Sequence, residues 1–149
     1  MNQLDESWAS IVRAHSGLLE GLQQLLVLDR SCERLRRELL TGDRKVALFV
    51  LPFVAEEQLV LLLPELLFLA SFGHGSIGHV RRMIRRIPTE ILIELIPPLA
   101  GKLLVGAEEY RRLLELYDEV ASPLRAQLAA EARRSSDEEI REIGEEFER

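Results

Sequence analysis

The sequence predicts an all-α protein, built as a right-handed stack of short antiparallel helix pairs, and three observations favour this fold class. Apolar residues follow helical spacing, and no segment shows the two-residue alternation of a strand between turn signals. Aromatic residues make up only 5% of the chain, so the core must be aliphatic, which favours helices over a β-sandwich. An arginine recurs at a fixed interval of 30 residues, at the end of segments 79–81, 109–111 and 139–141, and each time it leads into an amphipathic, arginine-led segment. A period of about 20 to 50 residues is typical of repeat proteins, whose units pack on their neighbours.

The first 42 residues are predicted to form irregular helices. Gly17 is expected to break this stretch, and Gly42 to end it as a glycine just past a helix C-terminus. Asp43 is the expected N-cap of the next helix. The apolar stripe that predicts the helices comprises Trp8, Ile11, Val12, Leu18, Leu19, Leu22, Leu25 and Leu26.

Six prolines divide the rest of the chain into short helices, because proline is tolerated in the first turn of a helix and not in its interior. Pro64 is expected either to kink the second helix of this region or to split it. Helices are predicted near 44–55, 57–72, 77–87, 89–104, 107–121, 123–134 and 137–148.

The last helix is predicted to begin at Ser136, with Glu139 as its capping-box partner. We therefore expect one helical-repeat domain over 1–149. It comprises irregular helices in 1–42, repeats over about 44–134, and a polar capping helix in 136–149.

Two segments resemble the HEAT-like α-solenoid repeats, and the resemblance covers about half of the chain. Residues 137–144, Asp-Glu-Glu-Ile-Arg-Glu-Ile-Gly, are similar to the run that opens the second helix of such a repeat. Residues 63–67, Leu-Pro-Glu-Leu-Leu, are similar to its proline-bearing first helix. The chain departs from the pattern where Ile77 and Ala107 occupy the position of Asp137. The resemblance implies an extended binding surface and usually no catalysis.

Composition and charge exclude several classes. A net charge of −6 argues against nonspecific nucleic-acid binding as the main activity. Cys32 is the only cysteine, so no internal disulfide can form, and a reducing, cytoplasmic location is expected. The N-terminal residues lack the pattern of a signal peptide. Charged residues and prolines interrupt the apolar stretch 46–72, so no membrane partner is expected.

The glycine-rich segment 71–79 is the first candidate site, with His74 and His79 as its candidate residues. Its glycines allow unusual backbone conformations or close approach of a partner, which would suit a peptide-binding loop. The alternative is an inter-helix turn in which Ser76 caps the next helix. Two histidines alone are too few for a metal site, which needs three or four ligands, so we expect no metal and no cofactor.

Arginines form the second candidate site. In stacked helix pairs the arginines of equivalent helices could align as a ladder that binds an acidic protein, a peptide or a phosphate. The alternative is internal pairing with Glu108, Glu109, Glu115 and Glu119. The acidic tail after Ser135 is either a solubilising cap or a cover for the arginines of a second copy, in a head-to-tail dimer. The candidate residues are Arg81, Arg82, Arg85, Arg86, Arg111 and Arg112.

We found no catalytic motif, and the chain is predicted not to be an enzyme. Glu56 and Glu57 are either a buried acid pair with raised pKa values or the mark of a turn between helices. The predicted function is a non-catalytic adaptor or scaffold that binds another protein through the arginines and the glycine-rich loop. A nucleic-acid-binding repeat that uses the same arginines is the alternative, and its binding would weaken strongly with salt.

Overall fold

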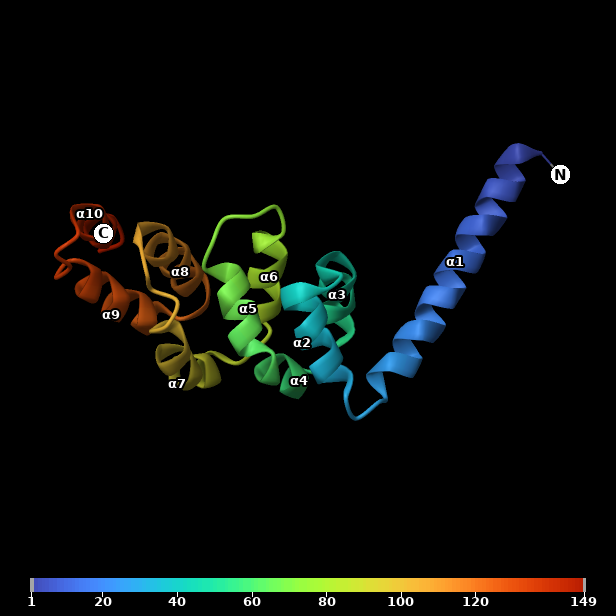
Figure 1. The fold of residues 1–149 in the computed structure, drawn as a ribbon, viewed down its shortest axis with the longest axis horizontal. Coiled ribbons are helices and arrows are strands. Elements are labelled where there is room, and N and C mark those ends of the chain that lie inside the picture. The colour runs from blue at the N-terminus through green and yellow to red at the C-terminus, as the bar shows by residue number, and fades with distance from the viewer. Residues whose placement is uncertain (1, 149) are drawn as a thin grey trace. The chain divides into compact units, whose positions relative to one another are not determined.

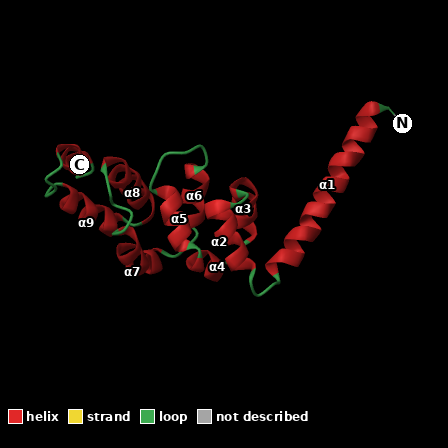
Figure 2. Cartoon of the chain, viewed as in Figure 1, coloured by secondary structure: helices red, strands yellow, loops and turns green. Residues whose placement is uncertain are grey.

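The computed structural model describes residues 2–148, and over that range the chain forms helices and no strands (Figure 2). The prediction of an all-α protein is confirmed. Contacts divide the chain into two compact units, Met1–Val54 and Ala55–Arg149. This division falls about ten residues after the predicted start of the repeats near 44. A single repeat domain over 1–149 stays a prediction.

The first unit contains a long helix followed by shorter ones: α1 (Gln3–Leu26), α2 (Ser31–Thr41), α3 (Arg44–Val50) and the 3-10 turn η1 (Leu51–Phe53) (Figure 1). The predicted break at Gly17 is wrong, since α1 runs through it. One glycine costs a helix only about 1 kcal/mol. A capping box between Asn2 and Asp5 supports the start of α1, and the chain leaves the helix after Leu26.

The turn between α2 and α3 begins at Gly42, as predicted, but for a different reason. Gly42 has φ −113°, so the left-handed conformation is not used. A Cβ on residue 42 would stand 2.0 Å from the Glu38 Oε2, so the glycine leaves room for the Glu38 side chain. There the Glu38 carboxylate accepts a hydrogen bond from the Asp43 amide at 2.6 Å. Asp43 is the N-cap residue of α3, as predicted, although its side chain makes no capping bond.

The second unit comprises α4 (Glu56–Leu61), α5 (Leu63–Ala70), α6 (Ile77–Ile84), α7 (Thr89–Ala100), α8 (Ala107–Val120), α9 (Ser122–Ala132) and α10 (Glu138–Glu146). The predicted helix 57–72 is split at Leu62, because Pro64 has no N–H to continue the hydrogen-bond ladder of α4. Glu56 and Glu57 are exposed in the first turn of α4, which confirms the turn interpretation. The buried acid of the second unit is Glu65 on α5.

Helices of the second unit fall into two sets of neighbours. Helix α7 contacts both α5 and α9, while α8 contacts α10 (Figure 1). Helix α5 packs on α6, and α9 packs on α10. The middle pair departs from this order, since α8 packs mainly against α9 rather than against α7. Thr89 at the start of α7 still donates a hydrogen bond to the Val120 carbonyl at the end of α8.

The core follows the recurrence that the sequence displays. Met83, Leu113 and Ile143 lie 30 residues apart on α6, α8 and α10, and all three side chains are buried. The next position along each helix holds Ile84, Leu114 and Gly144, which are also buried. Equivalent positions of the three arginine-led helices therefore face the interior of the second unit.

The last helix begins one residue later than predicted. Asp137, rather than Ser136, is its N-cap, and the Asp137 carboxylate accepts a hydrogen bond from the Ile140 amide at 3.2 Å. Asp and Ser are comparable N-cap residues, so the sequence does not distinguish Ser136 from Asp137 as the N-cap of this helix. The Ser135 hydroxyl accepts a hydrogen bond from the Asp137 amide instead.

Candidate interaction surface

Arg81 lies between α6 and α8 and is engaged within the protein. Its side chain is only 14% exposed. The guanidinium donates to the Glu115 carboxylate at 2.6 Å and to Glu119 at 3.4 Å, and it also reaches the Arg112 carbonyl. Arg81 thus joins α6 to α8, the next arginine-led helix. Little of the Arg81 side chain remains exposed to a partner.

Three other candidate arginines also pair internally. Arg85 contacts Glu119, and Arg112 donates to Glu115, three residues further along its own helix. Arg111 makes two hydrogen bonds to the Glu146 carboxylate, at 3.0 and 2.9 Å, which join α8 to α10. The internal-pairing alternative is confirmed at Glu115 and Glu119, whereas Glu146, the partner of Arg111, was not among the predicted acids.

These contacts repeat along the unit at a nearly constant displacement. Arg81 pairs with a glutamate 34 residues further on, and Arg111 with one 35 residues further on. The corresponding Arg141 on α10 has no later helix in the described chain to meet. It donates instead to the carbonyls of Ser135 and Ser136, in the turn that precedes its own helix.

Glu115 is the centre of the cluster between α6 and α8. Partial burial raises the pKa of its carboxyl, but hydrogen bonds from Arg81 and Arg112 outweigh that effect and hold the pKa below its usual range. The charged form of Glu115 is therefore favoured by folding. Glu146 has a lowered pKa as well, mainly because of the hydrogen bonds from Arg111.

Arg82 and Arg86 are the remaining two candidate arginines. Both are exposed, at the C-terminal end of α6 and in the turn that follows it. Arg82 approaches the His79 Nδ1 at 3.4 Å, and Arg86 lies 4.0 Å from the Met83 sulfur. Of the six candidate arginines, these two and Arg85 are exposed, whereas the other three are half-buried.

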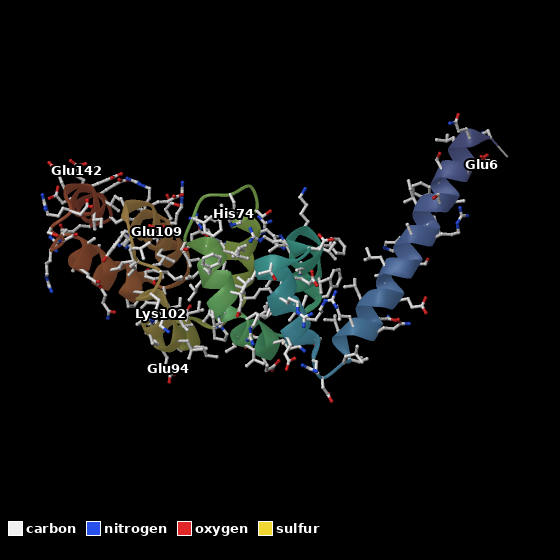
Figure 3. The ribbon with its side chains drawn as sticks, viewed as in Figure 1. Glu6, His74, Glu94, Lys102, Glu109 and Glu142 are labelled. Carbon is white, nitrogen blue, oxygen red and sulfur yellow. The ribbon has the colours of Figure 1, made fainter. Side chains whose placement is uncertain are left out.

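His74 holds the glycine-rich loop against the end of α5 (Figure 3). Its Nε2 lies 2.6 Å from the Leu69 carbonyl, and its Nδ1 accepts a hydrogen bond from the Ser76 amide at 3.2 Å. Because a carbonyl only accepts and an amide only donates, the ring must carry its proton on Nε2. The ring also packs against Phe72, with centroids 5.1 Å apart. Both ring nitrogens are occupied, so His74 has a structural role.

The loop is also bound to α8. The Gly73 amide donates to the Glu108 carboxylate at 2.9 Å, and a Cβ at residue 73 would stand 3.3 Å from that oxygen. No glycine in the described chain has positive φ, so the loop does not use a left-handed conformation, and Gly73 is the loop glycine that a neighbouring side chain approaches closely. Ser76 precedes α6, as predicted, but makes no side-chain capping bond. The loop is a docked connection between helices.

A small pocket of about 120 Å³ lies between α7, α8 and α9. Tyr117, Leu124 and Leu128 line it, and Glu131 stands at its edge. Burial raises the pKa of the Tyr117 phenol, and the charge of Glu131 adds to this effect. The Tyr110 hydroxyl lies 3.4 Å from the Glu131 carboxylate. A helical pattern gives no signal for such a pocket, since it arises from how the helices meet.

Comparison with known proteins gave no match, whether with family models, curated proteins or solved structures. Within residues 2–148, no three or more His, Cys, Asp or Glu side chains gather as a metal site would require. No helix of that range combines the length and the apolar character needed to cross a bilayer.

Proposed function

We propose that this chain is a non-catalytic protein-interaction module whose second unit is a HEAT-like stack of helix pairs. The pairs are α5–α6, α7–α8 and α9–α10, and the stack is right-handed. The repeated cross-link from arginine to glutamate, Arg81 to Glu115 and Arg111 to Glu146, carries the proposal. Near-equivalent units that pack only on their neighbours would make such contacts at a constant displacement.

The binding surface that we propose is smaller than the six arginines of the sequence pattern. Arg81 and Arg111 join helices, and Arg112 holds the Glu115 carboxylate that Arg81 also binds, so their removal would damage the stack before it affected a partner. Arg82 and Arg86 form the exposed part, and the half-buried His79 lies beside Arg82 on the same helix, α6. Guanidinium groups bind carboxylates in a bidentate manner, so an acidic protein segment is the expected partner.

The test is a comparison of bound proteins on immobilised full-length chain in native cell extract. The variant Arg82→Glu/Arg86→Glu is expected to lose partners that the wild type retains. The control variant Lys102→Glu/Arg134→Glu makes the same change of charge at exposed sites elsewhere in the second unit and should retain them. If the arginine variant keeps every partner, this surface is not the binding site.

Nucleic acid is the alternative ligand for the same arginines. Two observations disfavour it, namely the net charge of −6 and the ion pairs already made by Arg81, Arg85, Arg111 and Arg112. Binding of a labelled oligonucleotide measured at several salt concentrations separates the two ligands. A steep fall of affinity with salt, lost in the Arg82→Glu/Arg86→Glu variant, would favour nucleic acid.

A further inference from the structure

Helix α1 carries a row of large apolar side chains that its own unit leaves exposed. Leu4, Trp8 and Ile11 are 76%, 67% and 57% exposed, and the row continues through Leu18. Only the last turns of α1 are covered, where Leu22 is buried and Leu25 is half-buried beside a groove lined by α2 and α3. An amphipathic helix of this length is marginal in water without a partner for its apolar face.

The spacing of that row is the spacing of a coiled coil. Large side chains alternate four and three residues apart along α1, with one polar member, His15. In heptad notation the d positions are Leu4, Ile11, Leu18 and Leu25, and the a positions are Trp8, His15 and Leu22. A repeat of 3.5 residues keeps a continuous seam facing a second helix, whereas a 3.6-residue helix lying on a flat surface needs no such register.

The charges of α1 are placed where they would not repel an identical helix. Glu6, Arg13 and Glu20 all fall at the f position, on the face opposite the seam. Asp5 is the only charged residue at an e or g position, and it lies at the N-terminal end. Charged e and g residues normally decide which helices pair. Their near absence lets two copies of this helix associate.

Residues beside the seam fit one another by size in a parallel pair. The e positions carry large apolar residues, Val12 and Leu19, while the preceding g positions carry Ser7 and Ala14. In a parallel coiled coil each g residue faces the e residue that follows it on the partner helix. In a parallel pair, each small g residue would then face a large e residue of the partner helix. In an antiparallel pair, the large e residues of the two helices would face each other on one side of the seam.

We propose that α1 pairs with α1 of a second copy of this chain as a parallel, in-register coiled coil. The six large apolar residues between Leu4 and Leu19 expose roughly 700 Å² per copy, or up to roughly 1,400 Å² for the pair, within the range of specific interfaces. His15 of the two copies meets in one layer, where a polar a residue fixes the register and weakens the pair. This inference rests on the first unit and is independent of the proposed function.

A membrane surface is the other apolar occupant to weigh, and the polar face of α1 disfavours it. Helices that lie on anionic bilayers carry Lys and Arg on that face. Outside its apolar row, α1 has one basic residue, Arg13, against three acidic ones, Asp5, Glu6 and Glu20. An anionic bilayer would repel it.

Sedimentation equilibrium of the full chain, from low micromolar to about millimolar protein, tests the proposal. A reversible monomer–dimer equilibrium is expected. Ile11→Glu places an unpaired charge in the seam of each copy and should raise the dissociation constant at least about a hundredfold. Ile11 is exposed within its own unit, so the monomer should still fold. Arg13→Glu, at the f position, is the matched control and should leave the dissociation constant within about twofold.

Two further variants test the register. His15→Leu should tighten the dimer about tenfold or more, because it removes the polar layer. Leu4→Cys in a Cys32→Ser background should form an interchain disulfide on mild oxidation, since only a parallel pair brings the two N-terminal ends together.

Several outcomes would overturn the proposal. They are a monomer at every concentration, a dimer that Ile11→Glu leaves intact, and a dimer that Leu4→Cys fails to cross-link. Cosedimentation of a monomeric chain with vesicles of equal parts phosphatidylcholine and phosphatidylserine would show that a bilayer covers α1 instead.

Discussion

Gly144 of α10 lies close against the backbone at the end of α9. A Cβ on this residue would stand 2.8 Å from the Arg133 nitrogen and 2.9 Å from the Ala129 carbonyl oxygen. Backbone atoms cannot move aside as the end of a flexible side chain can. The residue scale therefore offers a clear test of the packing between the last two helices.

Gly144→Ala is expected to destabilise the protein by about 1 to 3 kcal/mol, because the two helices must move apart to accommodate one methyl group. Gly17→Ala is the matched control. A Cβ there would have nothing within 4 Å, so helix propensity should stabilise α1 by up to about 1 kcal/mol. Urea unfolding followed by circular dichroism measures both, and equal effects of the two substitutions would contradict the packing of α9 on α10.

Glu115 makes the stability depend on pH in a predictable direction. Its pKa is lowered in the folded state, so its contribution is present above the usual pKa of a glutamate, ~4.3, and is lost as the pH falls through the folded value. Glu115→Gln should therefore destabilise the protein at pH 7. The gap between wild type and variant should shrink as the pH approaches 3. A gap that stays constant would mean that the Glu115 charge contributes nothing.

At the scale of elements, arginine-to-glutamate pairs join α6 to α8 and α8 to α10 with unequal strength. Arg81 and Glu115 are 14% and 27% exposed, whereas Arg111 and Glu146 are 38% and 56% exposed. Water screens the second pair more effectively, so the α6–α8 contact should depend on its ion pair more than the α8–α10 contact does.

Double-mutant cycles measure this difference. The coupling energy between Arg81→Met and Glu115→Gln is expected at about 0.5 to 3 kcal/mol, and that between Arg111→Met and Glu146→Gln is expected to be smaller. Urea unfolding of the variants at low and high salt gives both coupling energies. High salt should reduce the coupling between Arg111 and Glu146 more than that between Arg81 and Glu115. The reverse order of coupling would mean that α6 and α8 are held by apolar contacts alone.

The sequence predicted those elements whose signal is local. The recurrence at Arg81, Arg111 and Arg141 predicted the positions of α6, α8 and α10. It could do so because the spacing of the buried residues is set within each helix. Proline marked the division at Leu62 for the same reason. Gly17 was misjudged because a glycine weakens a helix without necessarily ending it.

Contacts between helices could not be predicted in the same way. The sequence offered Glu108, Glu109, Glu115 and Glu119 as partners for the arginines, and the structure uses Glu115 and Glu119 among them. Glu146 was missed because its partner depends on how α10 stacks on α8. The sequence predicted His74 as a binding residue, whereas in the structure the Leu69 carbonyl and the Ser76 amide occupy both of its ring nitrogens.

At the scale of the whole molecule, the two units carry different proposals. The first unit offers the helix α1 for self-association, and the second offers Arg82 and Arg86 for an acidic partner. Dimerisation through α1 would place two Arg82/Arg86 surfaces in one complex. A partner with two acidic segments would then bind the dimer more tightly than a single segment binds one surface.

The central claim is that α5–α10 are three near-equivalent helix pairs stacked in steps of about thirty residues. A crystal structure of the full chain tests it most directly, through the rotation and translation that superpose α6 on α8 and α8 on α10. The account predicts that both steps are nearly the same right-handed operation, with Arg81–Glu115 and Arg111–Glu146 at corresponding places. Two unrelated operations, or three helices converging on one shared core as in a bundle, would contradict it.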